Sequence, residues 1–234
     1  MERVKTGIPG LDELLDGGIP ISASVLVSGG SGTCKTILGL QYLYAGAKQY
    51  AEPGIYVTIE ASIKNITWNI ESFGWDLKQL QDKNMLRIYR LQFDTQRDID
   101  AQISTQLSFI ASLVKEMKAK RLVIDSTTSF GIWIKDEGQL RNTLFKFCDG
   151  LKEMGCTTLL VAETKGGKTD YSAFGVEEFI VDGVVVLYFT PPNRSIFIKK
   201  MRGTNHSKTI HPLEITKFGL SVRAKDEILW DSIK

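Results

Sequence analysis

Hydrophobic residues in the first part of the chain follow two patterns that alternate along the sequence. Short runs that are apolar almost throughout indicate buried strands, and longer segments with apolar residues at steps of three and four indicate helices. The runs predict strands at 25–28, 54–60, 85–90, 121–126 and 157–163, and the longer segments predict helices at 36–49, 63–73, 99–117 and 140–154. Strands that are apolar on both faces and alternate with helices predict an α/β fold with a parallel sheet covered on both sides.

The pattern changes after about Gly166. β-rich segments at 183–189, 195–201, 211–216 and 219–223 follow one another across short turns such as PPNR and KFG. Closely spaced strands of this kind predict an antiparallel meander. No repeat, low-complexity tract or linker divides the chain, so we expect one domain over 1–234, and the tail KDEILWDSIK has the pattern of a short amphipathic helix.

Composition narrows the function classes only slightly. The chain is 43% apolar and 24% charged, as globular domains are, and its net charge of +2 gives no electrostatic argument for nucleic acid or an anionic membrane. No apolar run approaches the ~18 residues of a membrane-spanning helix, and MERVKTGIPG lacks the apolar core of a secretory signal. Cys34, Cys148 and Cys156 have no metal-ligand spacing. We therefore expect free thiols and a cytoplasmic protein.

The segment VLVSGGSGTCKTILGL, residues 25–40, carries the clearest chemical signal. It matches the pattern G-x-x-x-x-G-K-[ST], except that Cys34 stands where the pattern has its second glycine. A strand, a glycine-rich loop and a helix in this order form a phosphate-binding loop, in which Lys35 would neutralise phosphate and Thr36 would bind Mg²⁺. A connection that binds nothing is the less favoured alternative. The predicted nucleotide-binding residues of the loop are Gly29, Gly30, Ser31, Gly32, Thr33, Cys34, Lys35 and Thr36.

Cys34 supports a separate hypothesis about the loop. Its Cβ and sulfur must fit where glycine has only a hydrogen. A thiol beside a helix N-terminus and Lys35 is expected to have a lowered pKa. Oxidation or alkylation of Cys34 would then block the entry of phosphate.

Two carboxylates end predicted strands at the sheet edge where open α/β folds bind ligands. Asp125 closes RLVID and suits the Walker-B carboxylate that holds Mg²⁺ through water. Glu60 closes YVTIE on the same edge and could act as the general base that polarises the attacking water. A helix cap or turn carboxylate is the alternative for each, and it is stronger for Glu60 than for Asp125.

An ordered set of motifs resembles the RecA-like ATPase domain of the KaiC family, in the form of the archaeal single-domain proteins. The motifs are TGIPGLDELLDGGIP, the glycine-rich loop, EPGIYVTIEAS, SFGWDL, RLVIDSTTS, LKEMGCTTLLVAE, FGVEEFIVDGVVVL and KKMRGTNHSKTIHPLEIT. The resemblance covers about 6–223 and leaves a short tail, 224–234. It implies a RecA-like P-loop NTPase core, with a mostly parallel sheet and antiparallel C-terminal strands. It also implies an ATP- and Mg²⁺-dependent ring, usually a hexamer, with the nucleotide between subunits.

The resemblance also implies roles for single residues. Lys35 and Thr36 correspond to the family's phosphate and Mg²⁺ residues, and Glu60 corresponds to the glutamate that activates water. Relatives of the clock type often carry two successive glutamates there, whereas here Glu60 precedes Ala61. Any role of the second carboxylate is therefore lost.

The motif K-x-R-G-T-x-H, which in the family acts on a neighbour's ATP, is intact and contains Lys200, Arg202 and His206. Lys200 and Arg202 lie two apart on a predicted strand, so both could reach one γ-phosphate. Without the resemblance, a solvated basic edge strand is the favoured interpretation. Glu163 ends LLVAE where relatives often place a residue that senses the γ-phosphate, and a solvated strand-end acid is its alternative.

These features favour a slow ATPase that forms a ring and acts as a nucleotide-driven switch. An ATP-dependent scaffold or sensor without hydrolysis is the alternative that Cys34 and Ala61 support. A RadA-like accessory role in DNA repair or recombination is allowed by the superfamily, but the chain has no strong basic excess or recognisable added DNA-binding domain. By analogy with RecA-like rings, the loop 165–175 would face the channel and contact DNA or a protein tail, and a mobile surface loop is the simpler interpretation.

Overall fold

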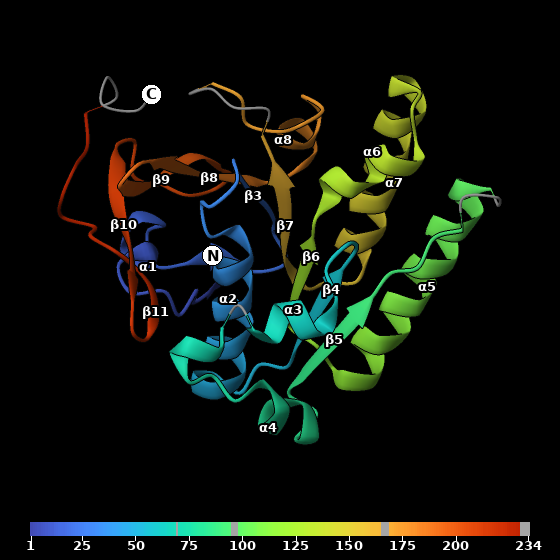
Figure 1. Cartoon of the computed structure of the whole chain (residues 1–234), viewed down its shortest axis with the longest axis horizontal. Helices are drawn as coiled ribbons and strands as arrows, with labels where there is room; N and C mark the ends of the chain where they lie inside the picture. The colour runs from blue at the N-terminus through green and yellow to red at the C-terminus, as the bar shows by residue number, and fades with distance from the viewer. Residues whose placement is uncertain (69, 95–97, 165–168, 230–234) are drawn as a thin grey trace.

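The protein is described by a computed structural model over residues 1–68, 70–94, 98–164 and 169–229. In these ranges the chain forms a large sheet of nine strands flanked by helices (Figure 1). In spatial order the strands are β11 (Gly219–Val222), β10 (Ile210–Thr216), β9 (Asn193–Met201), β8 (Gly183–Thr190), β3 (Ser24–Gly29), β7 (Thr157–Glu163), β6 (Arg121–Asp125), β4 (Gly54–Thr58) and β5 (Leu86–Arg90).

The sheet has a parallel part and an antiparallel part. From β8 to β5 all neighbouring strands run parallel, whereas β9, β10 and β11 are antiparallel to their neighbours. Strand β8 joins the two parts, because it pairs in parallel with β3 and antiparallel with β9. The predicted fold, mostly parallel with an antiparallel C-terminal flank, is confirmed.

Helices cover both faces of the parallel part. The helices of the described ranges are α1 (Leu11–Leu14), α2 (Lys35–Gln49), α3 (Ile63–Trp68), α4 (Leu77–Asp82), α5 (Ile99–Met117), α6 (Phe130–Trp133), α7 (Glu137–Glu153) and α8 (Glu177–Ile180). Successive residues of β3 enter different cores: Val25 and Val27 pack in the core that contains α2, and Leu26 packs in the core that contains α5 and α7. The apolar run of β3 is therefore explained by burial on both of its faces.

Several short elements differ from the sequence predictions. The predicted helix 63–73 is wrong in its length, because α3 ends at Trp68 and a separate 3-10 turn spans Glu71–Phe73. The Thr67 hydroxyl donates to the carbonyls of Ile63 and Lys64, and such side-chain bonds compete with the regular helix. The small sheet of β1 (Arg3–Val4) and β2 (Ile19–Pro20) was not predicted, since two-residue strands have no readable period.

The tail and the loop 165–175 lie partly outside the described residues. The described tail, 225–229, contains no helix, and Ile228 instead bridges to Ile210 at the start of β10. The helix predicted for the tail is therefore wrong in this part, and residues 230–234 lie outside the description. Positions 165–168 of the loop also lie outside it. Within the described ranges, no helix has the length and apolar character needed to span a membrane.

Candidate functional site

A cavity of about 620 Å³ opens at the sheet edge where the parallel strands end. Strands β3, β4, β6 and β7 run in the same direction, so their carboxyl ends meet at this edge. Open α/β sheets bind ligands at such an edge. The cavity is lined by Ser31, Gly32, Cys34, Lys35, Thr36, Ile37, Glu60, Ala61, Asp125, Ser126, Glu163, Arg194 and Ile215.

The loop between β3 and α2 has the compact backbone that phosphate binding needs. A Cβ at Gly29 would lie 2.4 Å from the carbonyl oxygen of Leu187, so no other residue fits there without a shift. Gly32 adopts φ +75°, and Cys34 follows with φ 76° and ψ 25° at the N-cap of α2. Cys34 thus holds the left-handed conformation that favours glycine at this point of the pattern.

The Lys35 side chain folds back onto the loop that precedes it. Its Nζ donates to the carbonyl oxygens of Gly29 and Gly30, each at 2.8 Å. The side chain is buried, and this burial lowers the pKa of Lys35, whereas the charges of Glu163 and Asp125 raise it. The ammonium group is therefore held at the centre of the loop, where a phosphate bound by the loop N–H groups would lie.

Thr36 and Asp125 meet at the floor of the cavity. The Thr36 hydroxyl donates to Oδ2 of Asp125 at 2.7 Å, and the Tyr56 hydroxyl donates to the same oxygen. Burial raises the pKa of Tyr56, so the phenol keeps its proton and remains a donor. A hydroxyl and a carboxylate are the hard oxygen ligands that suit Mg²⁺ beside a phosphate. The pair predicted to bind the metal is thus brought together, and its chemistry fits the ion.

The two other carboxylates reach the same cavity from neighbouring strands. Glu60 follows the end of β4, and its Oε1 accepts a hydrogen bond from Ser129 Oγ at 2.5 Å. Glu163 ends β7, and its backbone N–H donates to the Thr128 hydroxyl at 2.8 Å. The predicted general base and the predicted γ-phosphate sensor are therefore both placed at the cavity.

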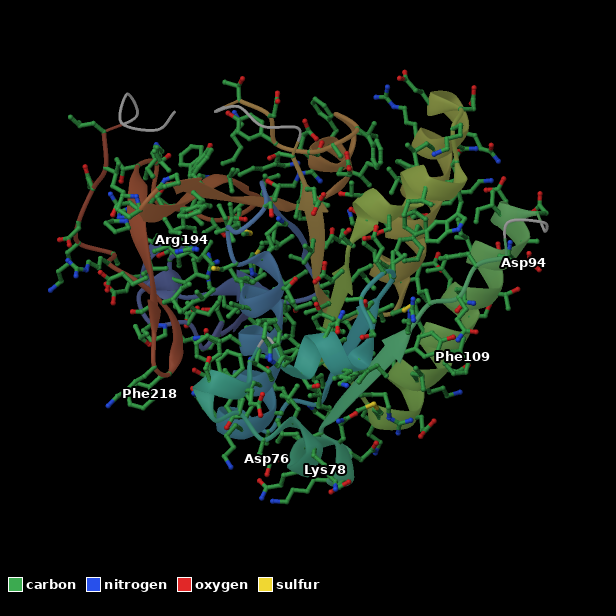
Figure 2. The ribbon with its side chains drawn as sticks, viewed as in Figure 1. Asp76, Lys78, Asp94, Phe109, Arg194 and Phe218 are labelled. Atoms are coloured by element: carbon green, nitrogen blue, oxygen red, sulfur yellow. The ribbon has the colours of Figure 1, made fainter. Side chains whose placement is uncertain are left out.

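Arg194 belongs to the cavity, although sequence reasoning did not select it. Figure 2 shows where Arg194 lies, near the antiparallel C-terminal strands. Its Nε donates to the Gly32 carbonyl at 2.9 Å, and its guanidinium lies 4.2 Å from the centre of the Phe189 ring. In the sequence it is only the last residue of the turn PPNR. The sequence does not reveal the strand order, in which β9 lies next to β8 and β8 lies next to β3, the strand that leads into the loop. Without this order, Arg194 cannot be assigned to the cavity.

Lys200 and Arg202 lie away from the cavity of their own chain. Lys200 pairs with Val184, which pairs with Leu26, whereas the loop begins at Gly29. Along β3, Leu26 and Gly29 are three residues apart, which is about 10 Å in a strand. The loop then extends from Gly29 further away from Lys200. Within one chain, the K-x-R motif and the phosphate-binding loop therefore face opposite edges of the sheet.

The basic residues of this motif make local contacts. Lys200 Nζ donates to the carbonyls of Glu178 at 3.1 Å and Val181 at 2.7 Å, and burial lowers the pKa of Lys200. Arg202 pairs with Asp182 at 3.1 Å. His206 Nδ1 lies 2.7 Å from the carbonyl oxygen of Ser207. All three were predicted to bind ATP, and none lines the cavity of its own chain.

The hypothesis of a lowered Cys34 pKa is wrong. Burial raises the pKa of the thiol, and this effect outweighs the lowering by the positive charges of Arg194 and Lys35. The thiol also lies within 3.8 Å of the Gly32 carbonyl, to which it acts as a weak donor. The protonated thiol is therefore favoured over the thiolate.

Because the thiolate is the reactive form, we expect iodoacetamide at pH 7.5 to label Cys34 several-fold more slowly than free cysteine. Labelling should accelerate as the pH rises above the ordinary thiol pKa. Mass spectrometry of the labelled peptide measures the rate, and Cys34→Ala removes the signal and so assigns it. Labelling faster than free cysteine would contradict the raised pKa.

Together these features define a class of protein. A mostly parallel sheet whose strand β3 leads through a glycine-rich loop into α2, with a lysine, a threonine and a strand-end aspartate at its edge, is the arrangement of a RecA-like P-loop protein. Residues 4–227 match the family described as "ATPase: KaiC". The chain therefore belongs to the KaiC ATPase family.

Individual relatives agree with this assignment. The UPF0273 protein MK0039 of Methanopyrus kandleri is 35% identical over 238 residues, covering 95% of this chain and 92% of that protein. The crystal structure of the KaiC-like protein PH0186 of Pyrococcus horikoshii has a TM-score of 0.84 and 39% identity, covering 94% of this chain and 98% of the other. The resemblance to the archaeal KaiC-like proteins is thus confirmed.

The clock proteins are longer than this chain. The circadian clock oscillator protein KaiC of Parathermosynechococcus lividus is 36% identical over 227 residues, which are 94% of this chain and 42% of that protein. The chain thus spans less than half the length of the clock proteins it matches.

Proposed function

We propose that the chain binds ATP with Mg²⁺ and hydrolyses it slowly between neighbouring copies of itself, in a ring whose state the nucleotide switches. The main support for this proposal is that one cavity is lined by Lys35, Thr36, Asp125 and Glu60. We expect the ring to be hexameric, as the family resemblance implies, and the protein to be cytoplasmic.

The loop residues would bind the triphosphate. Backbone N–H groups from Gly29 to Thr36 and the N-terminus of α2 attract anions, and Lys35 would exchange its carbonyl contacts for β- and γ-phosphate oxygens. Thr36 and Asp125 would hold Mg²⁺, which would neutralise charge on the phosphates when bound with them. Arg194, which sits over Gly32, adds positive charge beside the loop.

Glu60 would act on the attacking water. Its carboxylate lies on the cavity and can accept the proton that water loses as its oxygen attacks the γ-phosphorus. The bond between the γ-phosphorus and the bridging oxygen breaks, and ADP leaves. Glu163 at the end of β7 would respond to the γ-phosphate, or to its loss, from the same edge.

A second copy would complete the site. Lys200 and Arg202 face the edge opposite to their own loop, so they can contact ATP only on another chain. Positive charge from both side chains would stabilise the transferring phosphoryl group, as an arginine finger does. His206 lies near them in the chain and would join the same contact.

An ATP-dependent scaffold without turnover is the second candidate. Cys34 in place of the loop glycine and the single carboxylate at Glu60–Ala61 are the observations that favour it. A DNA-directed role has weaker support, since the net charge is only +2.

The concentration dependence of turnover separates the two candidates. We expect Mg²⁺-dependent phosphate release per chain to rise with protein concentration and then to saturate, because the active site needs two copies. Phosphate release is measured against a Glu60→Gln control at each concentration. Tight ATP binding without phosphate release at any protein concentration would favour the scaffold. Phosphate release per chain that stays constant even at concentrations where the protein is monomeric would contradict the shared site.

A further inference from the structure

A short segment after β6 carries four hydroxyl residues in succession, and each makes a defined contact. Thr127 donates to the Val161 carbonyl at 3.2 Å, and Thr128 accepts from the Glu163 N–H at 2.8 Å. Ser129 donates to Glu60, and Ser126 lies 3.2 Å from Ser129. The segment, which forms the 3-10 turn Thr127–Ser129, thereby connects the ends of β4, β6 and β7 around the cavity.

Among the described residues, Ser129 is the hydrogen-bond partner found for the Glu60 side chain. Glu60 lies beyond the end of β4, and its side chain is exposed to the cavity. A free glutamate side chain samples many rotamers, and ordering it costs conformational entropy. Ser129, in contrast, is 1% exposed and its hydroxyl is fixed in the fold.

The donors of the two hydrogen bonds at Ser129 can be assigned, because each serine hydroxyl has a single proton to donate. A carboxylate only accepts, so Ser129 must use its single proton on Oε1 of Glu60. The contact between Ser126 and Ser129 must then be donated by Ser126. Two hydroxyls therefore point in sequence toward Oε1 of Glu60. Oε2 has no hydrogen-bond partner among the described residues, so it is left to accept a proton from water in the cavity.

We propose that Ser129 is a positioning residue that orients Glu60 for the attack of water on ATP. The inference rests on the proposed function, in which Glu60 is the base. Ser129 keeps its proton throughout and touches neither ATP nor the water. Its effect is to hold the carboxylate beside the position that the attacking water must take. Small displacements of catalytic groups lower rates strongly.

Steady-state kinetics of the full chain test this role. Ser129→Ala should lower kcat about tenfold and leave KM for ATP unchanged, because the binding residues are untouched. Ser129→Thr, which keeps the hydroxyl, should recover most of kcat. Thr127→Val is the matched control, because it removes a hydroxyl of the same turn that contacts Val161 and not Glu60, and it should leave kcat within about twofold of wild type.

A double variant separates positioning from a general structural effect. In a Glu60→Gln background, Ser129→Ala should cause no further loss, since it acts only through the carboxylate. A further tenfold loss there would overturn the inference, and so would wild-type kcat in Ser129→Ala alone. If Ser129→Ala does not fold, Ser129→Cys keeps a γ atom with a much weaker donor and gives the same comparison. Wild-type turnover in Glu60→Gln would instead contradict the proposed function itself.

Discussion

Replacing Glu60 with glutamine is expected to lower ATP turnover by about 10²- to 10³-fold while leaving ATP affinity nearly unchanged. The amide has the size of the carboxylate but cannot accept the proton of the attacking water. Glu60 lines the same cavity as Asp125 and Lys35, and its carboxylate accepts a hydrogen bond from Ser129, which is outside the loop, so the phosphate-binding groups should be undisturbed. Phosphate release and nucleotide titration measure the two effects separately.

Glu71→Gln provides the matched control for charge and composition. Glu71 is an exposed glutamate in the 3-10 turn that follows α3, and it does not line the cavity. Its replacement should leave turnover within about twofold of wild type, since exposed surface changes rarely matter. If Glu60→Gln kept half or more of the wild-type turnover, Glu60 would not be the base.

Replacing Arg202 with alanine is expected to reduce turnover at least as much, by about 10³-fold, because arginine fingers contribute 10³ or more to phosphoryl transfer. The side chain is 59% exposed and its pair with Asp182 lies at the surface, so the fold should tolerate the change. ATP binding by the loop should persist. Comparison of phosphate release with nucleotide titration again separates catalysis from binding.

Lys199 offers a control on the same strand. It precedes Lys200 in β9, lies at the irregularity in the pairing with β8, and places its ammonium 4.5 Å from the centre of the Tyr171 ring. Lys199→Ala removes one positive charge from this region without touching the motif. Turnover should therefore stay near wild type in Lys199→Ala, and an equal loss in both variants would indicate a general effect of charge instead of a finger.

The parts of the site that sequence predicted are local. The loop, its lysine and its threonine follow one another within 29–36, so the strand and the helix that flank the loop suffice to place them. Asp125 needs one further strand, because it ends the apolar run at 121–125. Strands alternating with helices then predicted that Asp125 and the loop share an edge. The hydrogen bond from Thr36 to Asp125 agrees with this prediction.

The remaining features depend on contacts between distant segments. The position of Arg194 over Gly32 needs the order β9-β8-β3, which no local pattern contains. The bond from Ser129 to Glu60 joins two loops that follow β6 and β4. The pKa of Cys34 was predicted with the wrong sign, because its neighbours' charges can be read from the sequence and its burial cannot.

A mixture of two inactive variants tests the shared site most directly. Glu60→Gln lacks the base but retains its finger, and Arg202→Ala lacks the finger but retains its base. The two chains can be co-expressed with different tags and purified through both tags, so that every assembly contains both. If the site is shared, phosphate release should recover to about one quarter of wild type, because random mixing pairs an intact cavity with an intact finger at one interface in four. Release that stays at the residual level of the single variants would contradict it.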